Sequence, residues 1–232
     1  MARRYVIKQD SAPSAPISGI DYHATLNEEQ YAAVSSAPGA ALVIAGAGSG
    51  KTRTLTYRVA WLLDHGTDPW NILLLTFTNK AAREMTERVR ALIPIDLSRL
   101  WSGTFHSIAN RILRQHADYL GYTPAFTIMD SDDRKSMIKN IVKTLKLDEK
   151  SSRFPKPEVL SSLFSLADNE GAGIQETLEN AYPYLSNHLD AILDVHEQYV
   201  LRKQETNSMD FDDLLLNVVR LFQEQELLRA LY

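Results

Sequence analysis

Apolar and polar residues follow two different patterns along the chain, and the change falls near Phe105. Before that point, short apolar runs alternate with stretches whose apolar residues recur at helical spacing. Three runs predict strands, the second of them buried on both faces: Ala41–Ile44, Ile72–Leu75 and Leu100–Thr104. The stretches between them predict helices over residues 27–37, 52–65 and 80–93. Strands and helices in alternation are typical of a parallel α/β sheet.

After Phe105 the pattern is helical, and glycine and proline residues supply the turns. Helices are expected over residues 106–120, 131–147, 157–168, 184–203 and 212–225. We therefore predict an α/β fold with a parallel sheet domain, an inserted all-helical subdomain, and return helices that lead back to the sheet. Their expected bounds are 23–109, 110–207 and 208–232.

Composition limits the classes of protein that fit. The chain has 232 residues, 44% of them hydrophobic, which suffices for one large or two modest domains. It has no cysteine, so disulfides and Cys-based zinc sites are excluded and a reducing cytoplasmic location fits. No apolar run approaches the roughly 20 residues that span a bilayer, so no membrane role is expected. Residues 1–22 are polar and predict a disordered lead-in.

The net charge of −4 conceals a local basic region. Between Lys80 and His116 there are seven Lys and Arg residues against three carboxylates, which leaves +4 there and −8 elsewhere. A basic region on an acidic chain is compatible with a groove that follows a phosphate backbone. The alternative is an ordinary solvated helix face with pairs of opposite charge.

A glycine-rich segment follows the first predicted strand and precedes a predicted helix: Ala45, Gly46, Ala47, Gly48, Ser49, Gly50, Lys51 and Thr52. Glycines let successive backbone N–H groups converge on one anion, and the helix dipole favours negative charge at that point. In such loops the lysine binds the β- and γ-phosphates, and the threonine hydroxyl is a ligand for Mg²⁺. The strict motif has glycine where Ala45 stands. A chance glycine turn beside a lysine is the alternative.

Gln30 precedes this loop and has two interpretations. Its side-chain amide offers one donor and one acceptor, which match N7 and the N6 amino group of adenine. Asn27 stands three residues earlier, however, and this spacing favours a capping box at the start of a helix.

Two polar–aromatic segments follow the second and third predicted strands: Phe77, Thr78 and Asn79, and then Thr104, Phe105 and His106. Ligands meet an open α/β sheet at the carboxyl ends of its strands. A phenylalanine there can stack on a base, and the polar side chains can bond a phosphate. The alternatives are core phenylalanines and a surface histidine. Further on, Asp210, Asp212 and Asp213 are expected to cap a helix and not to hold a metal.

Taken in order, these segments resemble the UvrD/Rep family of superfamily 1 DNA helicases, and the agreement extends from Leu26 to the end of the chain. The phosphate loop of that family begins with alanine. The resemblance implies a RecA-like P-loop domain that binds ATP and Mg²⁺, with Gln30 as adenine reader and Arg53 as a further nucleotide contact. It implies that the two strand-end segments face single-stranded DNA.

The resemblance also implies a larger parent protein, an ATP-dependent 3′→5′ helicase of repair or replication that acts at single-strand/double-strand junctions. The Asp-Glu motif and the second RecA-like domain of the family are not found before Tyr232. We therefore expect this chain alone to be inactive, with an exposed sheet edge at Ala41–Ile44 that invites self-association. Other classes considered are a nucleotide kinase, for which no arginine-rich lid segment is visible, and a stand-alone nucleotide- or DNA-binding module.

Overall fold

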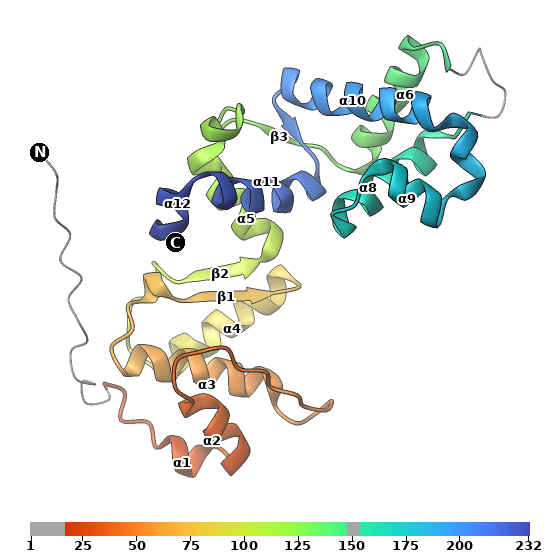
Figure 1. The fold of residues 1–232 in the computed structure, drawn as a ribbon. Coiled ribbons are helices and arrows are strands. Elements are labelled where there is room, and N and C mark those ends of the chain that lie inside the picture. Colours follow the sequence, from red (N-terminus) through yellow and green to blue (C-terminus); the bar gives the residue numbers. More distant parts are fainter. Residues whose placement is uncertain (1–16, 148–153) are drawn as a thin grey trace, which may run out of the picture. The chain divides into compact units, whose positions relative to one another are not determined.

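The chain divides into two units between Ile108 and Ala109 (Figure 1). The computed structural model describes residues 17–147 and 154–232. We call the part up to Ile108 the first unit and the part from Ala109 the second unit. Within the described ranges, no helix has both the length and the apolar character that crossing a bilayer requires.

A disordered lead-in was predicted over residues 1–22. Residues 1–16 of this range lie outside the described residues. From residue 17 onward the prediction of disorder is wrong. Asp64 accepts hydrogen bonds from the backbone N–H groups of Ile17 and Ser18, at 2.6 and 2.7 Å, and from the Tyr22 hydroxyl at 3.1 Å. A buried carboxylate needs such donors, and this one fixes the start of the first unit.

The first unit is built from helices around a two-stranded parallel sheet. Leu73 pairs with Trp101 and Thr76 with Thr104, and α4 forms the crossover that a parallel pair requires. The elements, in chain order, are α1 (Tyr22–Thr25), α2 (Glu28–Ser35), α3 (Lys51–Asp64), η1 (Pro69–Asn71), β1 (Leu73–Thr76), α4 (Asn79–Leu92), β2 (Trp101–Thr104) and α5 (Phe105–His116), the last of which continues into the second unit.

Two of the three predicted strands are confirmed, shifted by one residue, and their parallel pairing is confirmed. Burial of the second strand on both faces is wrong, because Leu73 is 54% exposed while Leu74 is buried. The core of the unit lies instead between β1, α3 and α4, where Val59, Leu63 and Val89 are fully enclosed. Figure 1 shows α3 and α4 together on one face of the sheet.

The predicted strand Ala41–Ile44 does not form. It has no strand pairing in the structure, and Leu42 and Ile44 are 87% and 88% exposed. A strand is stable only when a neighbouring strand shares its backbone hydrogen bonds, and neither β1 nor β2 pairs with this segment. The predictions of a buried strand and of an exposed sheet edge at Ala41–Ile44 are therefore both wrong, because the segment is exposed and unpaired.

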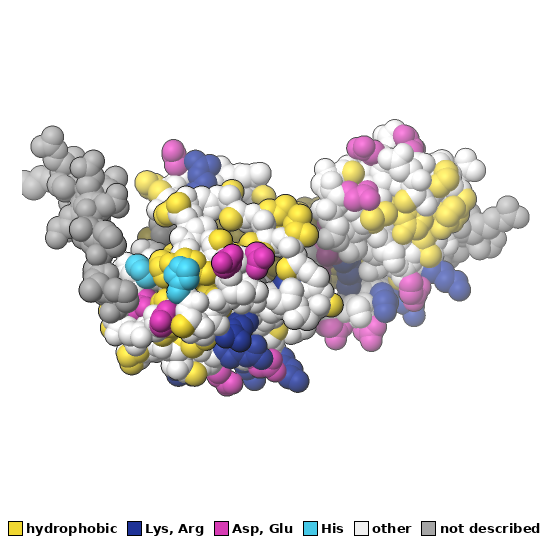
Figure 2. Space-filling model, turned by 90° about the horizontal axis from the view of Figure 1, so that it is seen from below, with side chains coloured by type: hydrophobic (Ala, Val, Ile, Leu, Met, Phe, Trp, Pro, Cys, Tyr) yellow, Lys and Arg dark blue, Asp and Glu magenta, His cyan; other side chains and the backbone are white. Residues whose placement is uncertain are grey.

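Aromatic and histidine side chains gather on one face of the first unit, where Figure 2 shows the histidines beside hydrophobic residues. Trp61 stacks on His65 with 3.9 Å between ring centroids, and His23 lies 3.9 Å from Tyr31. Tyr22 meets Trp61 edge-on at 5.0 Å. These contacts join α1 and α2 to the C-terminal half of α3.

The second unit is mainly helical, with one short parallel strand pair in which Thr127 faces Ser208 and Ile128 faces Met209. Its elements, after the rest of α5, are η2 (Ala117–Leu120), β3 (Thr127–Ile128), α6 (Ser131–Thr144), α8 (Pro157–Glu170), α9 (Ile174–Ala181), η3 (Pro183–His188), α10 (Leu189–Glu205), β4 (Ser208–Met209), α11 (Phe211–Glu224) and α12 (Glu226–Leu231). Its core joins α6, α8, α9 and α10 around Ile138, Phe164 and Ile192.

Each helix predicted after Phe105 has a counterpart in the structure, but the sequence reasoning missed several short elements. These are α9, α12, and the pair β3 and β4. A two-residue strand has no periodicity to detect, and β3 and β4 meet only because the fold brings Thr127 beside Ser208. The helix expected over residues 184–203 is a 3₁₀ turn followed by α10.

Candidate functional site

The glycine-rich loop ends where α3 begins, and two glycines make this possible. Gly48 and Gly50 have φ of +79° and +86°, a left-handed conformation that other residues adopt only with strain. Ser49 closes the turn by donating its backbone N–H and its hydroxyl to the carbonyl of Gly46, at 3.4 and 2.8 Å. Gly50 is the N-cap of α3, and no side chain caps this helix start. The first turn of α3 therefore keeps N–H groups that can bind an anion.

Lys51 is the first residue of α3 and bends back over the loop. Its Nζ donates to the carbonyl oxygens of Ala45 and Gly46, at 3.1 and 2.7 Å. Lys51 and Thr52 are both exposed. An ammonium group held by two neutral carbonyls can exchange them for a phosphate, since charged acceptors form the stronger hydrogen bonds. The loop residues, their glycine geometry and this lysine thus fit a phosphate group, and the Thr52 hydroxyl fits a Mg²⁺ ligand.

Gln30 performs the capping role and also contacts the loop. Its backbone N–H donates to Asn27 Oδ1 at 2.8 Å, and its Oε1 accepts from the Asn27 N–H, so the capping-box interpretation is confirmed. Its Nε2 donates to the carbonyl of Ser49 at 3.0 Å. A Cβ atom at Gly50 would lie 2.8 Å from that nitrogen, which is a second reason for glycine there. Adenine recognition by Gln30 remains a prediction, and it would require these partners to be exchanged.

Arg53 follows the loop on the first turn of α3. Its Nη2 donates to the carbonyl of Thr25 at 2.8 Å, and its guanidinium lies 5.5 Å from the centroid of the Tyr57 ring. Arg53 therefore holds the end of α1 against α3. Its predicted contact with a nucleotide remains a prediction.

The carboxyl ends of β1 and β2 bring two phenylalanines together, and we call this region the strand-end edge, comprising Phe77–Asn79 and Thr104–His106. Phe77 is 94% exposed and Phe105 is 49% exposed, so the core interpretation is wrong for both. Their ring centroids are 6.4 Å apart. An exposed aromatic pair at the carboxyl ends of parallel strands offers flat apolar faces to a ligand, since no residue of the described part of the first unit covers Phe77.

The polar residues of the strand-end edge also fix its backbone. The Thr78 hydroxyl accepts from the Ala81 N–H at 3.1 Å and caps α4. Thr104 Oγ1 accepts from the Ser107 N–H at 3.2 Å, and Ser107 Oγ accepts from the Thr104 N–H at 2.8 Å. Asn79 is exposed at the start of α4, and His106 is partly exposed in the first turn of α5. These bonds hold the two segments in place for any ligand that meets them.

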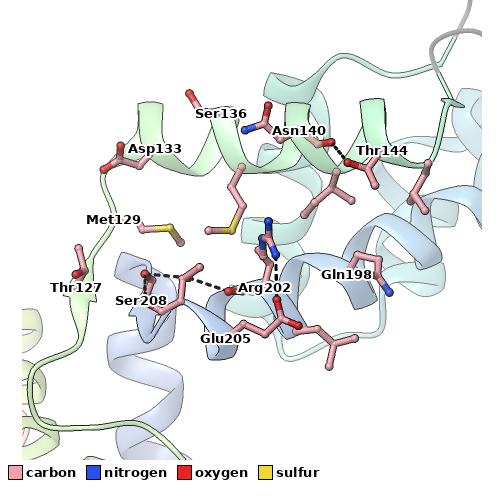
Figure 3. A pocket seen from close by; sticks show the side chains of 15 residues that line it. Thr127, Met129, Asp133, Ser136, Asn140, Thr144, Gln198, Arg202, Glu205 and Ser208 are labelled. Carbon is pink, nitrogen blue, oxygen red and sulfur yellow. Dashed lines mark hydrogen bonds and ion pairs between the residues drawn. The ribbon is translucent and has the colours of Figure 1, made fainter.

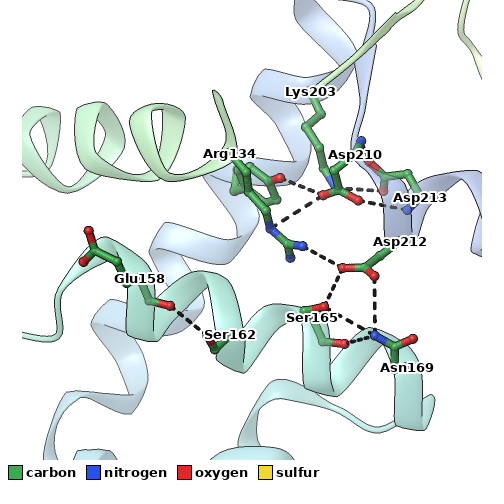
Figure 4. A network of polar contacts seen from close by, with 10 residues as sticks. Arg134, Glu158, Ser162, Ser165, Asn169, Lys203, Asp210, Asp212 and Asp213 are labelled. Carbon is green, nitrogen blue, oxygen red and sulfur yellow. Dashed lines mark hydrogen bonds and ion pairs between the residues drawn. The ribbon is translucent and has the colours of Figure 1, made fainter. Parts of the chain in front are cut away.

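A network of buried charges lies within the second unit (Figure 4). Lys203 is 4% exposed, and its Nζ contacts Asp210 Oδ2 at 3.2 Å and Asp213 Oδ1 at 2.7 Å. Arg134 Nη1 contacts Asp212 Oδ2 at 2.6 Å. The predicted structural role of these aspartates is confirmed, because Asp210 also caps α11 in a capping box with Asp213. Sequence reasoning missed Arg134 and Lys203. No local pattern marks the partner of Arg134, 78 residues away, whereas the partners of Lys203 lie only seven and ten residues further along the chain.

The network holds more carboxylates than cations, and its pKa values reflect this. Burial raises the pKa of Asp168 to about 6; the charge of Lys203 lowers this pKa, and the charges of the neighbouring carboxylates raise it. Burial acts on Asp210 as well, but the charges of Lys203 and Arg134 hold the pKa of Asp210 below its usual range. Asp168 therefore loses its proton at a higher pH than an ordinary aspartate does.

A hollow of about 580 Å³ in the second unit lies between α6, α10 and the β3–β4 pair (Figure 3). Apolar residues such as Met137 and Leu201 line it together with polar ones such as Ser136 and Gln198. Arg202, which also lines it, is paired with Glu205 at 3.1 Å. Because its lining cation is already paired, this hollow is a poorer phosphate site than the loop of the first unit.

Sequence comparison relates the chain to DNA helicases. The family profile described as UvrD/REP helicase N-terminal domain matches residues 26–232. The "ATP-dependent DNA helicase PcrA" of Staphylococcus aureus is 40% identical over 199 residues, and that of Staphylococcus epidermidis is 40% identical over the same length. Both matches cover 85% of this chain and 26% of the relative. The chain thus spans about a quarter of the length of the curated relatives it matches.

The family match begins at Leu26, just before the Asn27–Gln30 capping box, and includes the loop, the strand-end edge and the buried network. It covers nearly all of the described structure from α2 to α12. On this extent of agreement, the chain belongs to the UvrD/REP helicase family, and it corresponds to the N-terminal domain of that family.

Proposed function

We propose that the chain is the ATP- and single-stranded-DNA-binding N-terminal part of an ATP-dependent 3′→5′ DNA helicase. In this proposal the first unit is part of a RecA-like P-loop domain and the second unit is largely its inserted helical subdomain. The parent would couple ATP hydrolysis to translocation on single strands and at single-strand/double-strand junctions, in repair or replication in the cytoplasm. The observation that carries the proposal is the uncapped start of α3, which directly follows two left-handed glycines and places Lys51 over the loop.

The phosphates of ATP would replace the carbonyls of Ala45 and Gly46 as acceptors for Lys51. The N–H groups from Gly46 to Thr52 would supply the remaining donors, and Thr52 would hold Mg²⁺ with oxygen ligands that the ion prefers. Bound Mg²⁺ would neutralise phosphate charge and so assist phosphoryl transfer. Gln30 and Arg53 flank the loop and would contact the nucleotide.

The strand-end edge would bind single-stranded DNA. Phe77 and Phe105 offer faces for base stacking, which tolerates any sequence because every base has a π face. Thr78, Asn79, Thr104 and His106 would contact the sugar–phosphate backbone. The second RecA-like domain of the parent would pack beside the first unit. The exposed segment at Leu42–Ile44 would be covered by that packing or by a second copy of this chain.

Nucleotide binding should depend on Lys51. Lys51→Ala removes a charge-assisted contact worth about 1.5–3 kcal/mol, so a fluorescent ATP analogue should bind roughly ten- to a hundredfold more weakly. Lys139→Ala, which removes an exposed lysine of α6, is the matched control and should leave affinity unchanged. Identical titrations of the wild type and Lys51→Ala would refute the phosphate-loop role.

Hydrolysis by residues 1–232 alone should be slow and insensitive to DNA. Two carboxylates that could orient water, Asp212 and Asp213, are already engaged by Arg134 and Lys203 in the second unit. Arginine fingers, which the proposal assigns to the second RecA-like domain, contribute about 10³–10⁵ in rate in related NTPases. Phosphate release is measured with and without single-stranded DNA, and Lys51→Ala controls for contamination. DNA-stimulated release that disappears in Lys51→Ala would contradict this expectation.

A further inference from the structure

A hollow of about 430 Å³ lies between α4 and β2 in the first unit, beside the strand-end edge. Its polar lining residues are Asn79, Arg83, Thr86, Glu87, Arg90, Ser102 and Ser107. The family comparison assigns nothing to it. Its position and charge suggest a role in the same binding event as the strand-end edge.

Two arginines of one helix face define the hollow. Arg83 and Arg90 stand two turns apart on α4, a spacing that places both on the same side of a helix. Both are exposed, and within the described residues neither has a hydrogen bond or an ion pair closer than 4 Å. Other arginines are engaged, since Arg99 pairs with Asp68 and Arg58 donates to the carbonyl of Val34. Arg83 and Arg90 are therefore free to bind an anion.

The wall of the hollow where α4 meets β2 is fixed by side-chain hydroxyl groups. Thr86 and Ser102 are joined by a hydroxyl–hydroxyl hydrogen bond of 2.9 Å, which ties α4 to β2. A Cβ atom at Gly103 would collide with the Ser107 hydroxyl, so a larger residue there would displace this hydroxyl from its hydrogen bond with the Thr104 N–H. The wall therefore keeps its shape without support from a ligand.

The hollow continues the strand-end edge. Asn79 lines the hollow and also belongs to that edge, and Ser107 lines the hollow one residue after His106. A nucleic-acid strand whose bases stack on Phe77 and Phe105 can therefore pass Asn79 and enter the hollow. There it reaches Arg83 first and then Arg90, further along α4.

One carboxylate works against anion binding. Glu87 lines the hollow between the two arginines, so the lining keeps a net positive charge of one. Arg90 also faces Asp96, whose pKa is held below its usual range mainly by hydrogen bonds from Ser98 and to a smaller extent by the charge of Arg90. A nucleic-acid strand, whose phosphates each carry one negative charge and are spaced along the backbone, suits such a balance better than a compact, highly charged ligand does.

We propose that this hollow is a backbone subsite for single-stranded DNA, in which Arg83 and Arg90 bind the phosphates that follow the bases stacked at the strand-end edge. The inference rests on the proposed function, because it extends the DNA path assigned there. It adds two phosphate-binding residues, Arg83 and Arg90, and predicts a longer DNA-binding site than the two phenylalanines alone would give.

The test is the salt dependence of oligonucleotide binding to the full chain. Each phosphate contact on a single strand contributes about 0.7 to the slope of log affinity against log salt. The double variant Arg83→Ala/Arg90→Ala should lower the slope by about 1.4 and weaken binding at least tenfold at moderate salt. The loss should be the same for different base sequences and should be smaller for oligonucleotides too short to reach past Asn79.

Arg88→Ala is the matched control, because Arg88 is an exposed arginine of the same helix that lines a different surface, with Arg53 and Tyr57. A double variant that behaves like Arg88→Ala, while Phe77→Ala loses affinity, would overturn the subsite and leave the proposed function intact. A wild type that binds no single strand would overturn both. Arg83→Lys/Arg90→Lys keeps the charge and should restore most of the slope, and thermal unfolding of each variant identifies any loss of folding.

Discussion

The two units of this chain use polar side chains in opposite ways. In the second unit, Lys203 and Asp210 are 4% and 2% exposed and bond each other. In the first unit, Lys51 is exposed and rests on carbonyls of its own loop, and Phe77 stands almost entirely in solvent. Charges whose partners lie in the fold stabilise it, whereas exposed groups on a rigid frame are available to ligands.

Sequence resemblance alone does not separate these roles. The aspartates at 210–213 and the loop at 45–52 both lie in segments that resemble the UvrD/REP family. The geometry separates them, because Asp212 and Asp213 contact Arg134 and Lys203, whereas the start of α3 has no side-chain cap. We therefore predict that substitutions in the buried network change the stability of the fold. Substitutions in the loop or the strand-end edge should change ligand binding instead.

The largest expected effect is on the stability of the second unit. Lys203→Ala leaves the partly buried Asp213 without a cation and the buried Asp210 with Arg134 alone, and removal of one partner from a buried ion pair costs about 3–5 kcal/mol. The free energy of unfolding from urea titration measures this loss. Arg202→Ala, the adjacent residue with an exposed ion pair to Glu205, should cost at most about 1 kcal/mol. Equal losses for the two variants would contradict the structural role of the network.

A smaller effect, a gain in stability where Lys203→Ala gives a loss, is expected from Asp168→Asn. The pKa of Asp168 is raised to about 6 in the folded chain from 3.8, so the folded state binds this proton more tightly than the unfolded state does. Ionised Asp168 therefore destabilises the fold, and the penalty develops as the pH rises from about 4 to 6. Asp168→Asn should stabilise the chain by about 2 kcal/mol at pH 8, and the gain should shrink towards pH 4.

Unfolding of Asp168→Asn is measured across this pH range beside Asp194→Asn, which changes an exposed aspartate of α10. The control should show no such trend. A gain at Asp168 that does not vary with pH would mean that its charge is not the cause.

Much of the candidate site in the first unit was predictable from the sequence, because the patterns that mark it are local. The order glycine loop, lysine, helix and the two strand-end segments can be found by inspection, and Asn27 with Gln30 predicted the capping box. The strand at Ala41–Ile44 was predicted wrongly because hydropathy reports an apolar run but not whether a neighbouring strand is present to pair with it. The prediction of disorder at residues 17–22 failed because the partner, Asp64, lies more than 40 residues away.

The contact of Arg134 with Asp212 could not be predicted for the same reason, because 78 residues separate them. Lys203 lies only seven and ten residues before Asp210 and Asp213, but it looks like an ordinary surface residue of α10 until the turn after α10 places it beside them. Conversely, the exposure of Phe77 depends on what covers the end of β1, which hydropathy does not report. Long-range packing decides both cases.

The central claim is that exposed residues of the first unit serve ligands and not the fold, and Phe77→Ala tests it most directly. Both single-strand affinity and the free energy of unfolding are measured on the same preparation. We predict that affinity for an oligonucleotide falls by about 1–3 kcal/mol, since one stacked base is lost. Stability should change by less than about 0.5 kcal/mol, since the ring is 94% exposed. Unchanged affinity, or a loss of stability as large as the loss of binding, would contradict the claim.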